Sequence, residues 1–269
     1  MNLLFSESGM QRMDKIVQSG MLCAFDFDGT LAPIEPHPEK VQLPYDIQQR
    51  LITLSRYAPI AIITGRAVQD MQKYMGFSPD FIIGNHGIEG LPDWNQHAES
   101  YQMICGAWVQ KLSAAFQESA MADPGIWIEN KRYSLSVHYR PTPDIDHLEE
   151  KLKNLFTQLT PVPRVISGKQ VFNLLPHGAA DKGMALAKLM SSYHFHSAIY
   201  VGDDVTDEDV FRLRRSDVLT VRVENAVDSA AEFFLRQRHD IKHLLDELIV
   251  RLRLLRKAHL VDQPVDLAR

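Results

Sequence analysis

Residues 25–34 read F-D-F-D-G-T-L-A-P-I, the most informative stretch of the sequence. It closes an apolar run at residues 21–27 that is short and lacks helical periodicity, which predicts a buried strand with Asp26 and Asp28 at its carboxyl end. Alternate residues of a strand share a face, so two such carboxylates need a cation or a proton between them. One could be a nucleophile and metal ligand while the other transfers protons, which suits phosphoryl transfer through an aspartyl-phosphate. The alternative is a strand that ends in an ordinary Asp-Gly turn.

A second apolar run, residues 60–66, reads I-A-I-I-T-G-R and ends in a hydroxyl, a glycine and a guanidinium. We expect a buried strand followed by a helix, with Thr64 and neighbouring backbone N–H groups forming an anion site at the start of that helix. A simple N-cap role for Thr64 is the alternative.

A third signal is Lys182, within D-K-G at residues 181–183, immediately before an amphipathic helix predicted for residues 184–190. A lysine in the first turn opposes the helix dipole and therefore needs another reason to be there. Neutralising a bound phosphate is such a reason.

The densest charge lies at residues 199–209, which read I-Y-V-G-D-D-V-T-D-E-D, an apolar strand followed by five acids in seven positions. Such a cluster repels itself without a cation. Mg²⁺ is the natural partner because it is held by a few carboxylates and keeps several waters. For Glu208 and Asp209 we favour a solvated loop or a helix cap instead.

Taken in order, these four signals resemble those of the haloacid dehalogenase superfamily of phosphotransferases. They are D-F-D-G-T at residues 26–30 read from the first aspartate, Thr64, Lys182, and G-D-D at residues 202–204 with Asp207. Within the superfamily the chain resembles most the bacterial trehalose-6-phosphate phosphatases. The resemblance rests also on G-N-H-G-I-E at residues 84–89 and E-N-K-R-Y-S-L-S-V-H-Y-R at residues 129–140, and it spans roughly residues 20–230.

The resemblance implies roles for four catalytic side chains. Asp26 would attack phosphorus in line, and Asp28 would protonate the leaving sugar alcohol and then deprotonate the attacking water. Thr64 and Lys182 would spread positive potential over the equatorial oxygens, because phosphoryl transfer depends mainly on positioning and electrostatics.

The expected cofactor is Mg²⁺. The groups expected to bind it or to order its waters are Asp26, Asp28 through its backbone carbonyl, Asp203, Asp204 and Asp207. Substrate contacts from the core are expected at Gly65, Arg66, His86 and Gly87. For His86 a structural role stays an alternative.

The order of predicted elements indicates a split core with an insertion. Strands at residues 21–27, 59–64, 81–83, 198–201 and 218–223 alternate with helices at 44–57, 67–75 and 181–192, as in a doubly wound parallel α/β sheet. Between them lies a helix and a hairpin, given twice: 99–120, 126–129, 135–140, 144–159, 162–166 and 170–175, with a turn at 167–169. We therefore expect a Rossmann-like core of haloacid dehalogenase type, residues 1–92 and 177–269, with an inserted αββαββ C2-type cap at residues 93–176.

The first hairpin of the insertion carries a mixture of charges and aromatic rings: Glu129, Lys131, Arg132, His138 and Arg140 among Trp127, Tyr133 and Tyr139. Carbohydrate recognition needs such a mixture, although a solvated strand edge would look similar. The family pattern E-x-K-x-x-S-L-x-x-H-x-R favours substrate contact. In the second hairpin, Lys169 fits the family, whereas Asn173 and Leu175 replace its acid and its arginine, which puts the sugar contacts in doubt.

Composition excludes several classes of partner. The net charge is −5 without a basic block, so nucleic acid is not expected as a partner. Cys23 and Cys105 are predicted to be reduced, buried thiols, and no apolar stretch is long enough for a membrane span. We expect a cytoplasmic monomer that acts on trehalose 6-phosphate. Alternatives are another sugar-phosphate phosphatase, a phosphosugar mutase with the same nucleophile, or a non-catalytic sugar-phosphate sensor.

Overall fold

A computed structural model of the chain describes residues 1–35, 38–117, 125–139, 145–168 and 170–261. Within these residues a seven-stranded sheet runs in the order β1-β11-β10-β9-β2-β3-β4, and every pair in it is parallel. Its strands are β1 (Asn2–Leu3), β2 (Leu22–Phe25), β3 (Ile60–Ile63), β4 (Phe81–Ile83), β9 (Ala198–Gly202), β10 (Val218–Val223) and β11 (Phe233–Leu235). The predicted parallel α/β core is confirmed.

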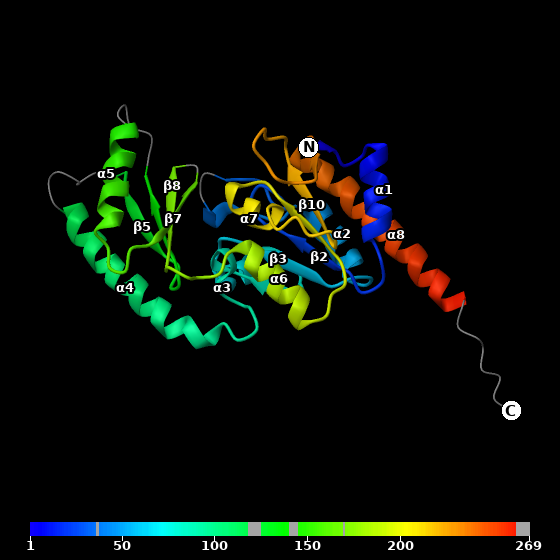
Figure 1. Ribbon diagram of the computed structural model, residues 1–269, viewed down its shortest axis with the longest axis horizontal. Coiled ribbons are helices and arrows are strands. Elements are labelled where there is room, and N and C mark those ends of the chain that lie inside the picture. Colours follow the sequence, from blue (N-terminus) through cyan, green and yellow to red (C-terminus); the bar gives the residue numbers. More distant parts are fainter. Residues whose placement is uncertain (36–37, 118–124, 140–144, 169, 262–269) are drawn as a thin grey trace.

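Helices cover both faces of this sheet (Figure 1). Successive side chains of β2 point to opposite faces of the sheet, so Cys23 and Phe25 pack in one core and Leu22 and Ala24 in the other. All four residues are buried because both faces are covered. The first core includes α1 (Glu7–Ile16), α2 (Tyr45–Leu54), α3 (Val68–Met75) and α8 (Ile241–Val261). The second includes α6 (Lys182–Ser192) and α7 (Glu208–Phe211). The sheet is therefore doubly wound.

A second, four-stranded antiparallel sheet is formed by the segment between β4 and β9. It runs in the order β5-β6-β8-β7, from β5 (Trp127–Asn130), β6 (Leu135–His138), β7 (Arg164–Gly168) and β8 (Val171–Leu175). One face packs on α4 (Asn95–Gln117) and α5 (Ile145–Thr157) through residues such as Trp108, Val137 and Phe172. Since strand side chains alternate, the other face carries Ser136 and Asn173. The helix-and-hairpin unit predicted twice is observed twice.

Several details differ from the sequence-based expectation. Ser167 and Gly168, which were expected in a turn, belong to β7, where Gly168 pairs with Val171. Helices α1 and α8 and strands β1 and β11 were not predicted. Cys23 and Cys105 are free and buried, and burial raises the pKa of each thiol to about 12, as expected for small apolar side chains. None of the helices in the described part of the chain has the length and apolar character needed to span a bilayer.

The topology fixes where a ligand would bind. Strand β2 lies between β3, the next strand of the core, and β9, which returns after the second sheet. Strand order thus reverses between β2 and β9, and ligands of doubly wound sheets bind at the carboxyl ends of the strands beside such a switch point. Asp26 follows β2 at this place, and Asp203 follows β9.

Candidate active site

Asp26 is held rigidly at the end of β2. Its backbone N–H continues the sheet by donating to the Val201 carbonyl at 2.8 Å, and only 4% of the residue is exposed. Its Oδ1 accepts a hydrogen bond from Lys182 Nζ at 2.8 Å. Lys182 is the first residue of α6 and is 2% exposed. Its charge opposes the helix dipole, and contacts with carboxylates stabilise it in this buried position.

Asp207 organises the groups around it. Its Oδ1 accepts from Lys182 Nζ at 2.8 Å and from the Tyr200 hydroxyl at 2.6 Å. Its Oδ2 accepts from the backbone N–H groups of Asp203 at 2.9 Å and Asp204 at 2.8 Å. An ionised carboxylate offers about four lone-pair sites, so this residue is saturated. It orients the lysine and the loop that follows β9.

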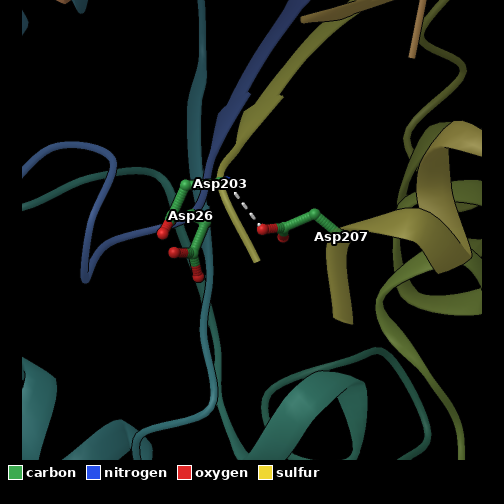
Figure 2. A group of neighbouring side chains, drawn as sticks. All are labelled: Asp26, Asp203 and Asp207. Atoms are coloured by element: carbon green, nitrogen blue, oxygen red, sulfur yellow. Dashed lines mark hydrogen bonds between the residues drawn. The ribbon is translucent and has the colours of Figure 1, made fainter. Parts of the chain in front are cut away.

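Asp203 completes a cluster of carboxylates with Asp26 and Asp207. Figure 2 shows Asp26 and Asp203 side by side, with Asp207 approaching from the opposite side. One ligand oxygen from each lies within 4.8 Å of the others. Thr30 Oγ1 donates to Asp203 at 2.9 Å.

The charge of this cluster calls for a cation. Burial, and then repulsion by Asp207, raise the pKa of Asp203 to about 7, and burial raises the pKa of Asp26 although Lys182 opposes the shift. Three carboxylates face one lysine. An all-oxygen donor set with excess negative charge fits a hard divalent cation.

Asp28 lies apart from the cluster. Its two oxygens accept from Arg66 Nε and Nη2, each at 2.7 Å, and the guanidinium also lies over the rings of Phe27 at 5.9 Å and Tyr74 at 4.7 Å. The expectation that Asp26 and Asp28 share a strand face is wrong, because β2 ends at Phe25 and Asp28 lies in the turn that follows. The guanidinium of Arg66, rather than a cation or proton shared with Asp26, balances the charge of Asp28.

The loop after β3 differs from the expectation of an anion site at a helix start. Helix α3 begins at Val68 with Ala67 as its N-cap, so Thr64 is neither an N-cap nor in the first turn. The backbone of this loop bonds to a distant segment instead: Thr64 N–H donates to Ile83 O at 2.8 Å, and His86 N–H donates to Thr64 O at 2.9 Å. Thr64 is 1% exposed and lines the cavity described below.

His86 is a buried side chain with unused hydrogen-bonding capacity. It is 7% exposed, and within the described residues neither ring nitrogen has a hydrogen-bond partner. Its backbone adopts a left-handed conformation with φ 60°, and a Cβ on Gly65 would lie 2.5 Å from the ring. Burial, and then the charges of Lys131 and Lys182, lower its pKa, which keeps the ring neutral.

Polar side chains of the second sheet face this region. Lys131 Nζ donates to the Gly65 carbonyl at 3.2 Å, which joins the two sheets. His138 Nε2 and Glu129 Oε2 are 2.8 Å apart, and Ser136 Oγ donates to Asn173 Oδ1 at 2.6 Å. Burial acts to raise the pKa of Glu129, but the hydrogen bond with His138 and the charge of Lys131 outweigh it, and the pKa is lowered. Glu129 is therefore an anion.

A cavity of about 280 Å³ joins these groups. Of the residues predicted to bind metal or substrate, it is lined by Asp26, Asp28, Thr64, Gly65, Arg66, His86, Glu129, Lys131, His138, Asn173, Lys182, Asp203 and Asp204. Arg140 and Lys169 lie outside the described residues. The structure does not bring three others into the cavity lining: Asp207, which is fully buried behind it, Arg132 and Gly87. Arg132 is exposed and donates to Gln102 of α4, and Gly87 packs against the backbone of Asp181.

Some neighbours of the site were not predicted. Ser136 lines the cavity, and its alternation with His138 along β6 is a signal that would have found it. Tyr200 could have been predicted, because it lies on a buried central strand and a buried tyrosine hydroxyl needs a hydrogen-bond partner. The expectation of a solvated loop or a cap is wrong for Glu208, which is 6% exposed and accepts from Arg222 Nη1 and from Ala230 N–H.

The parallel α/β sheet with its separate antiparallel sheet is a fold of the haloacid dehalogenase type. The chain belongs to the trehalose-phosphatase family, whose model it matches over residues 24–238, and it is a phosphoric monoester hydrolase.

Sequence relatives carry the name of the same family. The chain is 26% identical over 267 residues to trehalose-phosphate phosphatase B of Arabidopsis thaliana, covering 90% of this chain and 71% of that protein. It is 30% identical over 240 residues to the trehalose-phosphate phosphatase of Mycobacterium tuberculosis, covering 85% of this chain and 61% of that protein.

Solved structures share the fold. The C-terminal domain of trehalose-6-phosphate phosphatase from C. albicans superimposes with a TM-score of 0.70 at 21% identity, over 91% of this chain and 97% of that one. The sucrose-phosphatase of Synechocystis superimposes with a TM-score of 0.53 at 21% identity, over 86% of this chain and 98% of that one.

Proposed function

We propose that the protein hydrolyses trehalose 6-phosphate to trehalose and phosphate, the last step of trehalose biosynthesis. The membership of the trehalose-phosphatase family supports the substrate. The observation that carries the proposal is the shared cavity, which is lined both by Asp26 and Lys182 beside the parallel sheet and by Glu129 and Asn173 of the second sheet. Such a cavity offers one region for a phosphate and another for sugar hydroxyls.

In the proposed reaction Asp26 attacks phosphorus and the P–O bond to the sugar breaks, giving an aspartyl-phosphate, while Asp28 gives its proton to the leaving alcohol. Asp28 then takes a proton from water, and the resulting hydroxide releases phosphate from Asp26. Lys182 and Thr64 stabilise charge on the transferred group. Arg66 donates one hydrogen bond to each oxygen of Asp28, which orients this carboxyl group and leaves lone pairs for proton transfer.

The proposal includes Mg²⁺ as cofactor. The residues that would hold it are Asp26 and Asp203 through their carboxylates and Asp28 through its carbonyl. When bound, the ion would neutralise charge on the phosphoryl oxygens. The four hydrogen bonds to Asp207 leave it no free lone pair, so it would orient Lys182 and the loop rather than bind the ion directly. Asp204, which is exposed at the cavity, would contact water of the ion's hydration shell.

We further propose that residues 93–176 form a cap that selects the sugar, and that residues 1–92 and 177–269 form the catalytic core. The separate antiparallel sheet, with its polar face lining the cavity, supports this division. The proposal also includes action as a cytoplasmic monomer, in keeping with two free, buried thiols.

The test is phosphate release from trehalose 6-phosphate, glucose 6-phosphate and sucrose 6-phosphate, each with and without Mg²⁺. Preferred, Mg²⁺-dependent turnover of trehalose 6-phosphate is the expected result. Preference for another sugar phosphate, or an isomerised product, would replace the proposal by a sibling activity. Absence of turnover on all three would indicate a sensor.

A further inference from the structure

Three aromatic residues interleave the charges of the first hairpin, and the structure separates their roles. Tyr133 and Tyr139 are each 3% exposed. Tyr139 stacks on Phe172 in the core beneath the second sheet, and its hydroxyl donates to Glu149 at 2.7 Å. Trp127, in contrast, is 46% exposed. Of these three rings, it alone offers a broad surface to a ligand.

Trp127 lies beside the cavity. It precedes Glu129 by two positions in β5, so both side chains project from the same face of the sheet. In the sheet register it is paired with His138, and the two rings stack with centroids 4.7 Å apart and planes at 7°. His138 and Glu129 line the cavity, whereas Trp127 lies just outside its lining.

The direction of β5 shows where Trp127 lies relative to the contact with the core. Beyond β5 the chain continues to Lys131, whose Nζ reaches the Gly65 carbonyl of the core. Trp127 lies four positions before Lys131, which is ~13 Å along the strand at about 3.3 Å per residue. Lys131 is thus a part of this hairpin that contacts the core, and Trp127 lies farther along the strand from that contact.

The chemistry around Trp127 suits a pyranose ring. A sugar presents hydroxyls at its edge and C–H groups on its faces, so it needs polar partners around an apolar platform. Glu129 and His138 supply the polar partners. The stack on His138 holds the indole in one orientation, which lowers the entropy lost when a ligand packs on it. A single exposed apolar side chain is ordinary on a protein surface, but this one is fixed against a cavity-lining ring.

We propose that Trp127 is a specificity-determining residue that packs against the apolar face of the sugar remote from the phosphate. This inference rests on the proposed function. It assigns Glu129 and His138 to the hydroxyls of that sugar and leaves the phosphate to the core.

The kinetic test compares Trp127→Ala and Trp127→Phe with the wild type on trehalose 6-phosphate and glucose 6-phosphate. We expect Trp127→Ala to lower the ratio of the two kcat/KM values, trehalose 6-phosphate over glucose 6-phosphate, by about tenfold, mainly through KM for the disaccharide. Trp127→Phe should recover most of the ratio because it keeps a ring. Tyr45→Ala is the matched control, since Tyr45 is an aromatic residue 74% exposed on α2 of the core, and it should leave the ratio unchanged.

A binding measurement independent of turnover uses tryptophan fluorescence during titration of the intact enzyme with trehalose. The wild type should show a change in emission, and Trp127→Phe should abolish it, although Trp94 and Trp108 remain. If Trp127→Ala left the ratio of the two kcat/KM values unchanged, whether or not both values fell, the inference would be overturned. Turnover of trehalose 6-phosphate by the wild type would still uphold the proposed function. A wild type that does not hydrolyse trehalose 6-phosphate would overturn the proposed function itself, and this inference with it.

Discussion

At the scale of single residues, Lys182 is the side chain on which the site depends. A buried ammonium is costly unless it is paired, and here it contacts Asp26 and Asp207 at 2.8 Å each. Asp181 caps the helix beneath it by accepting from Met184 N–H at 2.8 Å. The lysine thus fixes the position of the proposed nucleophile.

Asp26→Asn is the first test at this scale. An amide is a poor nucleophile and a poor Mg²⁺ ligand, so turnover should fall by a factor on the order of 10⁴ or more. The fold should persist, because Lys182 keeps its bond to Asp207. Phosphate release at saturating Mg²⁺, with a melting curve of the same sample, measures both. Activity within about tenfold of the wild type would show that another group attacks phosphorus.

The second test at this scale uses pH. In the metal-free protein the pKa of Asp203 is raised to about 7 by burial and by Asp207, whereas an unfolded aspartate titrates near ~3.9. The folded state therefore holds the proton more tightly. This contribution to stability is fully present below about pH 4 and is lost as the pH rises through about 7, by up to about 1.4 kcal/mol per pH unit.

Melting curves from pH 4 to 8, recorded with a chelator and with Mg²⁺, check this expectation. Mg²⁺ competes with the proton, so it should raise the melting temperature more at pH 8 than at pH 5. Asp203→Asn is the control and should weaken both effects. Equal stabilisation by Mg²⁺ at the two pH values would contradict the assignment of this carboxylate to the ion.

At the scale of secondary-structure elements, the central strands were predictable and the loops at their ends were not. Strands β2 and β9 are buried on both faces, so their sequences are unbroken apolar runs that end at acids. The role of Thr64 at a helix start was wrong because the loop before α3 bonds to residues 83–86, which no local pattern reveals. The pair of Asp28 with Arg66 is hidden for the same reason, since it joins residues 38 positions apart.

The candidate site was predictable to a similar degree. Its core residues carry recognisable chemistry at strand and helix ends, and the cavity gathers nearly all of them. Their separate roles depend on geometry: four donors saturate Asp207, while the ring nitrogens of His86 have no hydrogen-bond partner among the described residues. Helix α8 was not predicted, although Leu244, Leu248 and Leu252 follow a helical spacing. Its segment contains no functional motif.

Gly202→Ala tests the element that carries Asp203 and Asp207. A Cβ at Gly202, the last residue of β9, would lie 2.2 Å from the Asp207 carboxyl carbon, and that side chain cannot yield without losing its hydrogen bonds. We expect a loss of about 1–3 kcal/mol in the free energy of unfolding and a decrease in kcat of about 10²-fold. Denaturant titration and phosphate release measure the two effects.

The matched control for that substitution is Gly106→Ala. Gly106 lies inside α4, and a Cβ there meets nothing within 4 Å. Alanine is the better helix former, so this variant should gain up to about 1 kcal/mol in stability and keep its activity. If Gly202→Ala were as stable and as active as Gly106→Ala, the close approach of Gly202 to Asp207 would not matter for the site.

At the scale of the whole molecule, buried hydrogen bonds join the antiparallel sheet to loops that follow strands of the parallel sheet. Lys131 Nζ donates to Gly65 O at 3.2 Å, and Ser134 Oγ donates to Asn85 Oδ1 at 2.6 Å. Both pairs are largely buried, so leaving one member unpaired costs about 1–3 kcal/mol. These contacts hold the two sheets together, whereas Glu129 bonds to His138 within its own sheet.

This difference separates two variants that sequence alone would treat as equivalent. Glu129→Gln keeps the shape and loses a charged acceptor for sugar hydroxyls, so kcat/KM for trehalose 6-phosphate should fall about tenfold or more, with a much smaller change on a generic phosphomonoester. Lys131→Met keeps an unbranched chain of similar length but removes the bond to Gly65 and so weakens the contact between the sheets. It should lower kcat/KM on both substrates. Steady-state kinetics of the two variants on both substrates decide the matter: if Lys131→Met spared the generic substrate, this lysine would contact the sugar rather than hold the two sheets together.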